Sequence, residues 1–127
     1  MSHFTTIKTE IYDLEILKQT LSHLRIDFEE EGKVQGFGGQ KEIADIAVKV
    51  DGRFRMGFKY NWRRGSYEIM GLKEYIHQAD FRKIIDRIRQ EYAYRKILAE
   101  TRKRGFALVQ EERVKTGTIK LVLRKVA

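Results

Sequence analysis

One stretch sets the fold class of this chain: Ile46-Ala47-Val48-Lys49-Val50-Asp51-Gly52-Arg53-Phe54-Arg55-Met56-Gly57-Phe58-Lys59-Tyr60. Its apolar side chains recur at every second residue, which is the spacing of a strand with one buried face. In its middle, Asp51-Gly52 is a two-residue turn signal, because both residue types tolerate positive φ. The stretch therefore predicts an antiparallel hairpin. The side chains expected on its buried face are Ile46, Val48 and Val50 before the turn and Phe54, Met56, Phe58 and Tyr60 after it.

The segments on either side of this hairpin add further strands and two helices. A turn at 61–65 and a strand at 66–72 follow it, and an alternating, β-branched strand at 2–11 opens the chain. Asp13 is the expected N-cap of an amphipathic helix of about 12 residues. Asp80 is the expected N-cap of a longer helix that reaches Arg104 and stops at Gly105. Two final strands are expected at 106–114 and 117–126.

These elements define the expected architecture. With a short strand near Ile26 and Phe28, their order is β-α-β-β-β-β-α-β-β. Strands joined by hairpins, together with two helices, indicate an α+β fold with a mainly antiparallel sheet. The length of 127 residues suits a single domain over 1–127.

The amino-acid composition excludes several classes of protein. The chain has no cysteine, which excludes disulfide scaffolds, thiolate metal sites and cysteine catalysis. No apolar run approaches the ~18 residues of a membrane helix, so no membrane insertion is expected. The N-terminus lacks the apolar segment of a secretory signal. We therefore expect a soluble protein in a reducing compartment.

The charge is divided unevenly along the chain. The net charge is +8, yet residues 1–61 hold 9 basic and 10 acidic residues, whereas residues 62–127 hold 17 and 8. The first half is thus near neutral and the second carries a net charge of +9. Such an asymmetry points to an anionic partner for the second half.

The long helix carries much of this surplus. Arg82, Arg89, Lys96 and Arg104 recur at seven- and eight-residue spacing, which places them along one side. Nucleic-acid phosphates, an acidic protein or plain solvent remain open as what this row faces. The residues predicted to bind the anion are Arg63, Arg64, Arg82, Arg89, Lys96, Arg102, Lys103 and Arg104.

The same helix has two apolar stripes on nearly opposite sides. The first contains Phe81, Ile85 and Tyr92 and is the expected core face. The second indicates either a kink or a crossing of the C-terminal half to another part of the sheet, or else a contact with a partner or a second copy of the chain. Its members are Tyr94, Ile97, Leu98 and Thr101, of which Tyr94, Ile97 and Leu98 are the candidate interface.

Two further motifs leave alternatives open. Trp62, beside Arg63 and Arg64, is either an exposed ring that stacks on unpaired bases or a buried ring flanked by surface arginines. The segment 36–39 contains three glycines but lacks the Gly-Lys-Ser/Thr ending of a phosphate-binding loop, so a bulge or flexible crossover is expected there.

Catalytic and metal-binding patterns are missing from the sequence. The three histidines, His3, His23 and His77, fit no zinc motif. No nucleophile–base constellation is visible, and Asp45 is the one acid that lies inside an apolar strand. We predict no catalytic residue, no metal site and no cofactor, and therefore a non-enzymatic protein.

Several short motifs resemble one known family. They include Met1-Ser2-His3-Phe4-Thr5-Thr6-Ile7-Lys8-Thr9, Val34-x-Gly36-x-x-Gly39 and Gly117-x-Ile119-x-Leu121. This pattern is similar to the uncharacterised family named for the thirty-fifth hypothetical chloroplast reading frame, found in algal plastids and cyanobacteria and also catalogued as a domain of unknown function. The resemblance implies a cyanobacterial cytoplasmic or plastid stromal protein and no particular reaction.

Two functions follow as expectations. The first is a non-enzymatic binding or regulatory module whose basic C-terminal half engages an anionic macromolecule, either RNA, DNA or an acidic protein. The second is a protein–protein interaction or assembly factor that uses the stripe on the long helix, including in a homo-oligomer. The family's distribution points this second function toward photosynthetic complexes.

Overall fold

The predicted hairpin forms the centre of a five-stranded antiparallel sheet. In the computed structural model, which describes residues 4–113 and 118–126, β5 (Ile46–Val50) pairs with β6 (Arg53–Asn61), and β6 pairs with β7 (Ser66–Leu72). Asp51 and Gly52 both have positive φ, at 53° and 78°, as the turn requires. Adding β1 (Phe4–Lys8) and β2 (Phe28–Glu30) at the edges gives the order β1-β7-β6-β5-β2. The α+β prediction is confirmed.

One detail of the hairpin differs from the prediction. Val48 pairs with Met56 but Lys49 pairs with Phe54, so Arg55 is an extra residue on β6. Such a bulge reverses the alternation of side chains beyond it. Phe54 therefore leaves the face of Met56 and lies on the opposite side of the sheet, with Lys49 Nζ 5.4 Å from its ring centre. Its expected place beside Met56 was wrong.

Both predicted helices are present. Helix α1 (Leu14–His23) begins after Asp13, whose carboxylate accepts a hydrogen bond from the Ile16 N–H at 3.1 Å, so the predicted N-cap is confirmed. A short helix α2 (Lys73–Ile76) precedes α3 (Ala79–Lys103), which begins after Gln78. Asp80 is thus in the first turn of α3 and is not its N-cap. The helix begins at Ala79, one residue before Asp80, directly after the turn that follows α2. The predicted end at Gly105 is confirmed by its φ of 81°.

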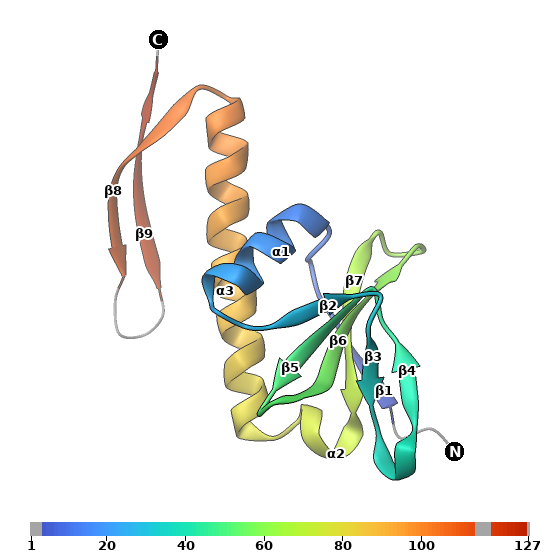
Figure 1. Ribbon diagram of the computed structural model, residues 1–127. Helices are drawn as coiled ribbons and strands as arrows, with labels where there is room; N and C mark the ends of the chain where they lie inside the picture. The colour runs from blue at the N-terminus through green and yellow to red at the C-terminus, as the bar shows by residue number, and fades with distance from the viewer. Residues whose placement is uncertain (1–3, 114–117, 127) are drawn as a thin grey trace.

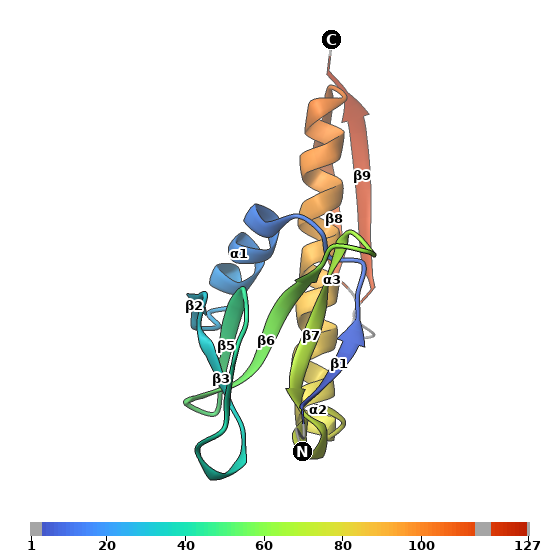
Figure 2. The same ribbon diagram turned by 90° about the vertical axis from the view of Figure 1, so that its right-hand side faces the viewer.

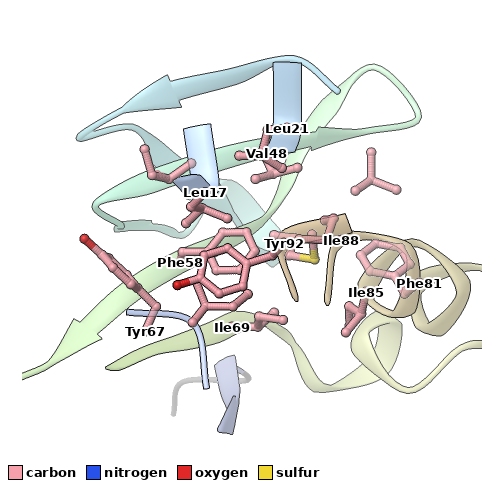
Figure 3. Close-up of a cluster of buried hydrophobic side chains, with 14 of the residues drawn as sticks. Leu17, Leu21, Val48, Phe58, Tyr67, Ile69, Phe81, Ile85, Ile88 and Tyr92 are labelled. Atoms are coloured by element: carbon pink, nitrogen blue, oxygen red, sulfur yellow. The ribbon is translucent and has the colours of Figure 1, made fainter. Parts of the chain in front are cut away.

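The helices cover one face of the sheet (Figure 1). Leu17 of α1 and Ile88 of α3 are fully buried against Phe58 and Ile69 of the sheet. Figure 3 shows these side chains packed together, with Tyr92 among them. The first apolar stripe of the long helix is therefore the core face, as predicted.

The opposite face carries a hairpin that the sequence did not predict. Strands β3 (Lys33–Gln35) and β4 (Lys41–Ile43) pair antiparallel and are joined by a single turn of 3₁₀ helix, η1 (Phe37–Gly39). The glycine segment is the tip of this hairpin and not a crossover. Val34 and Ala44 pack there against Ala47 and Met70 in a second, smaller core.

The C-terminal strands form a separate sheet. Helix α3 is continuous over 25 residues, and its C-terminal half extends past the five-stranded sheet (Figures 1 and 2). Strands β8 (Phe106–Arg113) and β9 (Ile119–Lys125) pair antiparallel alongside that half. The two final strands are thus confirmed, while Val114 and Gly117 lie outside the described residues. No helix in the described ranges is both long and apolar enough to span a membrane.

Candidate functional site

A groove runs between the chain after β1 and the middle of α3. Its volume is about 680 Å³, and it brings together Arg64, Arg89 and Lys96, three of the residues predicted to bind an anion. Lys8 adds a fourth positive charge, and Glu10 supplies one carboxylate. We call this feature the basic groove; its remaining lining residues are Thr9, Ile11, Tyr12, Tyr92, Ala93 and Ile97.

Two side chains of α3 build the walls of the basic groove. The Tyr92 hydroxyl accepts hydrogen bonds from the N–H groups of Tyr12 and Asp13, at 3.1 and 3.0 Å. The Arg89 guanidinium donates to the Lys8 carbonyl at 3.0 Å. These bonds hold the segment after β1 beside the helix, and they fix the Arg89 side chain at the rim of the groove.

The positive charge of Lys96 is paired with carboxylates of the protein itself. Its Nζ lies 3.1 Å from both Asp13 Oδ2 and Glu100 Oε1, and 4.7 Å from the ring centre of Tyr12. The hydrogen bond to Glu100, joined by that to Asp13, raises the pKa of Lys96 well above its ordinary value. Lys96 is therefore a permanent cation, but its charge is already compensated within the protein.

The other predicted anion-binding residues lie away from the basic groove. Arg82 is exposed near the start of α3, and Arg102, Lys103 and Arg104 are exposed at its end. At about 1.5 Å per residue, Arg82 and Arg104 are separated by roughly 33 Å along the helix. A single ligand could therefore contact the whole predicted row only if that ligand is extended.

Trp62 is exposed, so its interpretation as a buried ring was wrong. It projects from the turn between β6 and β7 with 87% of its surface accessible. Asn61 shapes this turn by accepting hydrogen bonds from the N–H groups of Arg63 and Arg64, at 3.0 and 3.3 Å. The turn therefore presents an indole ring and two guanidinium groups together.

The candidate interface on α3 is divided between two surroundings. Tyr94 donates a hydrogen bond to Glu111 of β8 at 2.6 Å and lies 4.9 Å from the Arg113 guanidinium. That bond, together with Arg113, holds the pKa of Glu111 below its ordinary value. Leu98 is half-buried, whereas Ile97 is 47% exposed and lines the basic groove. The C-terminal half of α3 therefore neither kinks nor crosses the main sheet; it carries the β8–β9 hairpin.

One buried carboxylate, that of Glu91, was not predicted from the sequence. Glu91 of α3 is only 3% exposed, with His23 Nε2 of α1 at 3.0 Å and the Arg113 guanidinium of β8 at 3.3 Å. A signal was available, because Glu91 follows Ile88 by three residues and so occupies the core stripe of the helix. Among the described residues, no group of three or more His, Asp or Glu side chains is placed to hold a metal ion.

Comparisons with known proteins agree with the resemblance in the sequence. The family model described as "Protein of unknown function (DUF1257)" matches residues 20–122. The uncharacterized proteins ycf35 of Pyropia yezoensis and Cyanophora paradoxa are each 32% identical to the chain, over 98% of both sequences. That of Guillardia theta is 32% identical over 129 aligned residues. No solved structure matches the chain significantly.

Proposed function

Since this chain belongs to the DUF1257 family of uncharacterized ycf35 proteins, for which no activity is known, we propose its function from the site alone: a non-enzymatic binding module that engages an anionic macromolecule through its basic C-terminal half. Relatives from plastid-bearing algae support a location in the plastid stroma or, for a cyanobacterial protein, the cytoplasm. The proposal concerns the basic groove and the neighbouring turn between β6 and β7.

The observation that carries the proposal is the convergence of basic residues from distant parts of the sequence. Arg64 reaches the groove from the turn after β6, Arg89 from α3 and Lys8 from the end of β1. None of these three forms an ion pair within the described part of the chain. Their charges are therefore available to a ligand, and a concave surface of one sign attracts counter-charges strongly.

Among polyanions, single-stranded nucleic acid fits this surface best. Trp62 is almost fully exposed beside Arg63 and Arg64, and exposed aromatic rings next to cations bind unpaired bases by stacking. An acidic protein would use the same charges but would have no need of the indole ring. Dependence of binding on Trp62 thus distinguishes a single-stranded nucleic acid from an acidic protein.

Fluorescence anisotropy with labelled ligands tests this proposal. Short single-stranded RNA and DNA and polyglutamate would be titrated at several salt concentrations. We expect R63Q/R64Q to weaken nucleic-acid binding about tenfold and to lower the salt slope by roughly 0.7 for each lost phosphate contact. A matched control is K33Q/K41Q, which removes the same charge from the β3–β4 hairpin. No binding of any polyanion at low salt would contradict the proposal.

A second candidate function is an interaction or assembly factor that contacts another protein, or a second copy of the chain, around the hairpin of β8 and β9. Ile97 is 47% exposed, and Val109 and Val122 of the hairpin are each 49% exposed. Val109 and Val122 lie on the paired strands β8 and β9, whereas Ile97 lines the basic groove, and neighbouring exposed apolar side chains favour a protein contact. Light scattering of the wild type and I97E would test the homo-oligomer, since a monomeric mass for both excludes it.

A further inference from the structure

A second hollow lies next to the basic groove and has the opposite character. It opens beside the turn between β6 and β7, with a volume of about 650 Å³. Among the residues that the structure describes, its lining contains four aromatic side chains, three carboxylates and one leucine, and no basic side chain. We call it the aromatic pocket; its lining residues are Tyr12, Leu14, Glu30, Glu31, Asp45, Tyr60, Trp62 and Tyr67.

The rings of the aromatic pocket stand at steep angles to one another. Tyr60 meets Trp62 at a centroid distance of 4.7 Å and Tyr67 at 5.0 Å, with an angle of 73° between the planes in both pairs. Tyr60 and Tyr67 are cross-strand partners on β6 and β7, so the sheet fixes their relative position. Because the three rings are not parallel, a single bound ligand can contact the faces of more than one of them.

Trp62 contacts the Tyr60 ring at its edge but is otherwise open to solvent. With 87% of its surface exposed, its burial contributes little to the stability of the fold. An indole face is, however, the strongest aromatic partner for a cation. The exposure of Trp62 beside a hollow lined by other rings is therefore explained by a ligand better than by packing.

The carboxylates give the aromatic pocket a negative charge within a basic protein. Asp45 is anchored by accepting a hydrogen bond from the Tyr60 N–H at 2.6 Å. Glu31 is positioned by its own N–H, which donates to the Asp45 carbonyl at 2.7 Å. Burial, together with the Asp45 carboxylate, raises the pKa of the Tyr67 hydroxyl.

The nearby cations do not neutralise the whole pocket. Lys18 lies 3.2 Å from Glu30, but it also pairs with Glu15. Lys96 faces Tyr12 but is held by Asp13 and Glu100, outside the pocket. Lys59 lines an adjoining hollow with Asp45 and Trp62, and it forms no ion pair in the described ranges. Asp45 and Glu31 thus remain available to a guest.

We propose that the aromatic pocket binds a methylated ammonium group, either of a free quaternary amine or of a methylated lysine in a partner protein. Aromatic faces favour a cation that is large and weakly hydrated, and methylation gives an ammonium both properties. The carboxylates at the pocket add Coulomb attraction without the ring of oxygen ligands that a metal ion requires. This inference shares Trp62 with the proposed nucleic-acid surface, but the two sites use different charged residues, so D45N and R63Q/R64Q test them separately.

Trp62 is the only tryptophan in the chain, so its fluorescence reports directly on the pocket. The protein would be titrated with tetramethylammonium chloride and, at the same ionic strength, with sodium chloride. We expect a saturable change of emission with tetramethylammonium alone. A response that does not saturate, or that sodium chloride reproduces, would overturn the proposal.

Variants assign the binding to named residues. D45N keeps an oxygen that can accept the Tyr60 N–H but removes the charge, and because Asp45 is exposed we expect it to weaken tetramethylammonium binding about threefold. D51N, in the turn at the opposite end of β5, is the matched control and should bind as the wild type does. W62L, followed by the NMR signal of the ligand methyl groups, should lose binding while its circular dichroism stays unchanged. Wild-type affinity in D45N and W62L would contradict the assignment.

Two further titrations separate the sources of the ammonium group. Choline represents a free quaternary amine, and a peptide with trimethyllysine represents a partner protein. Tighter binding of the peptide identifies a protein partner, whereas tighter binding of choline identifies a small molecule. Equal affinity for the same peptide with unmethylated lysine would overturn the proposal. Anion binding at the basic groove would be unaffected by D45N, so failure of one proposal leaves the other intact.

Discussion

Glu91 of α3 and Arg113 of β8 lie 3.3 Å apart and join the C-terminal hairpin to the body of the protein. Glu91 is 3% exposed and is also 3.0 Å from His23 of α1, so one carboxylate connects three elements. Most side chains of β8 and β9 are exposed, and a two-stranded hairpin is marginal by itself in water. The hairpin therefore depends on this contact and on the Tyr94–Glu111 hydrogen bond for its position.

We expect E91Q to loosen the hairpin. Removal of one partner from a fully buried ion pair costs about 3–5 kcal/mol. Here Arg113 and His23 are about half exposed and become solvated once Glu91 is lost, so we expect a smaller loss, about 1–2 kcal/mol. Urea unfolding would measure it, and hydrogen exchange should rise in β8 and β9. E112Q, a change at an exposed residue of β8, is the control. Equal hydrogen exchange of the hairpin in the two variants would contradict the role of Glu91.

Y92F should destabilise the wall of the basic groove. The Tyr92 hydroxyl is the hydrogen-bond acceptor for the N–H groups of Tyr12 and Asp13. Phenylalanine keeps the ring in the core but leaves two partly buried donors without that acceptor, at a cost of about 1–3 kcal/mol. Thermal unfolding measures the loss, with Y75F as a control that removes a different tyrosine hydroxyl. An unchanged melting temperature in Y92F would show that water replaces the hydroxyl at no cost.

Stability should fall in acid partly through Asp13. Although burial acts to raise it, hydrogen bonds from the Ile16 N–H and Lys96 hold the pKa of Asp13 below its ordinary value. A carboxyl whose pKa is lower in the folded state stabilises the protein above its unfolded pKa, and this contribution disappears as the pH falls through the folded value. D13A should thus cost about 1 kcal/mol at neutral pH. The difference from the wild type should shrink below about pH 4.

Denaturant unfolding across this pH range would measure both effects. D86A, an exposed change on α3, removes a carboxylate that forms no ion pair in the described residues. It should show no comparable convergence with the wild type in acid. A difference between D13A and the wild type that is the same at all pH values would contradict the expected link.

Local patterns were sufficient to predict most elements of the fold. The Asp51-Gly52 turn, the Asp13 cap and the Gly105 stop each depend on a few neighbouring residues, and all three are found. The misplacement of Phe54 came from the bulge at Arg55, which leaves no mark in the alternation itself. The strands of the β3–β4 hairpin have only three residues each, too few to show a period.

The candidate site was less predictable than the fold. The row on α3 could be placed on a helical wheel, but the wheel does not show that Lys96 meets Asp13, which is 83 residues away in the sequence. Likewise, the meeting of Arg64 with Arg89 depends on the packing of the β6–β7 turn beside α3. Contacts between distant segments are set by the tertiary fold, and the pattern of a single sequence carries no record of them.

The close contact at Gly57 provides a direct test of how the β3–β4 hairpin is held. A Cβ atom at Gly57 would lie 2.7 Å from Val34 Cγ2 and from Ala44 Cβ, and 3.0 Å from the Ile46 carbonyl oxygen. G57A should therefore push the hairpin away from the sheet at a cost of about 1–3 kcal/mol. Because V34A removes one of the clashing groups, G57A should cost less in a V34A background than in the wild type. Urea unfolding of the four proteins measures this coupling, and strictly additive losses would mean that Val34 does not press on Gly57.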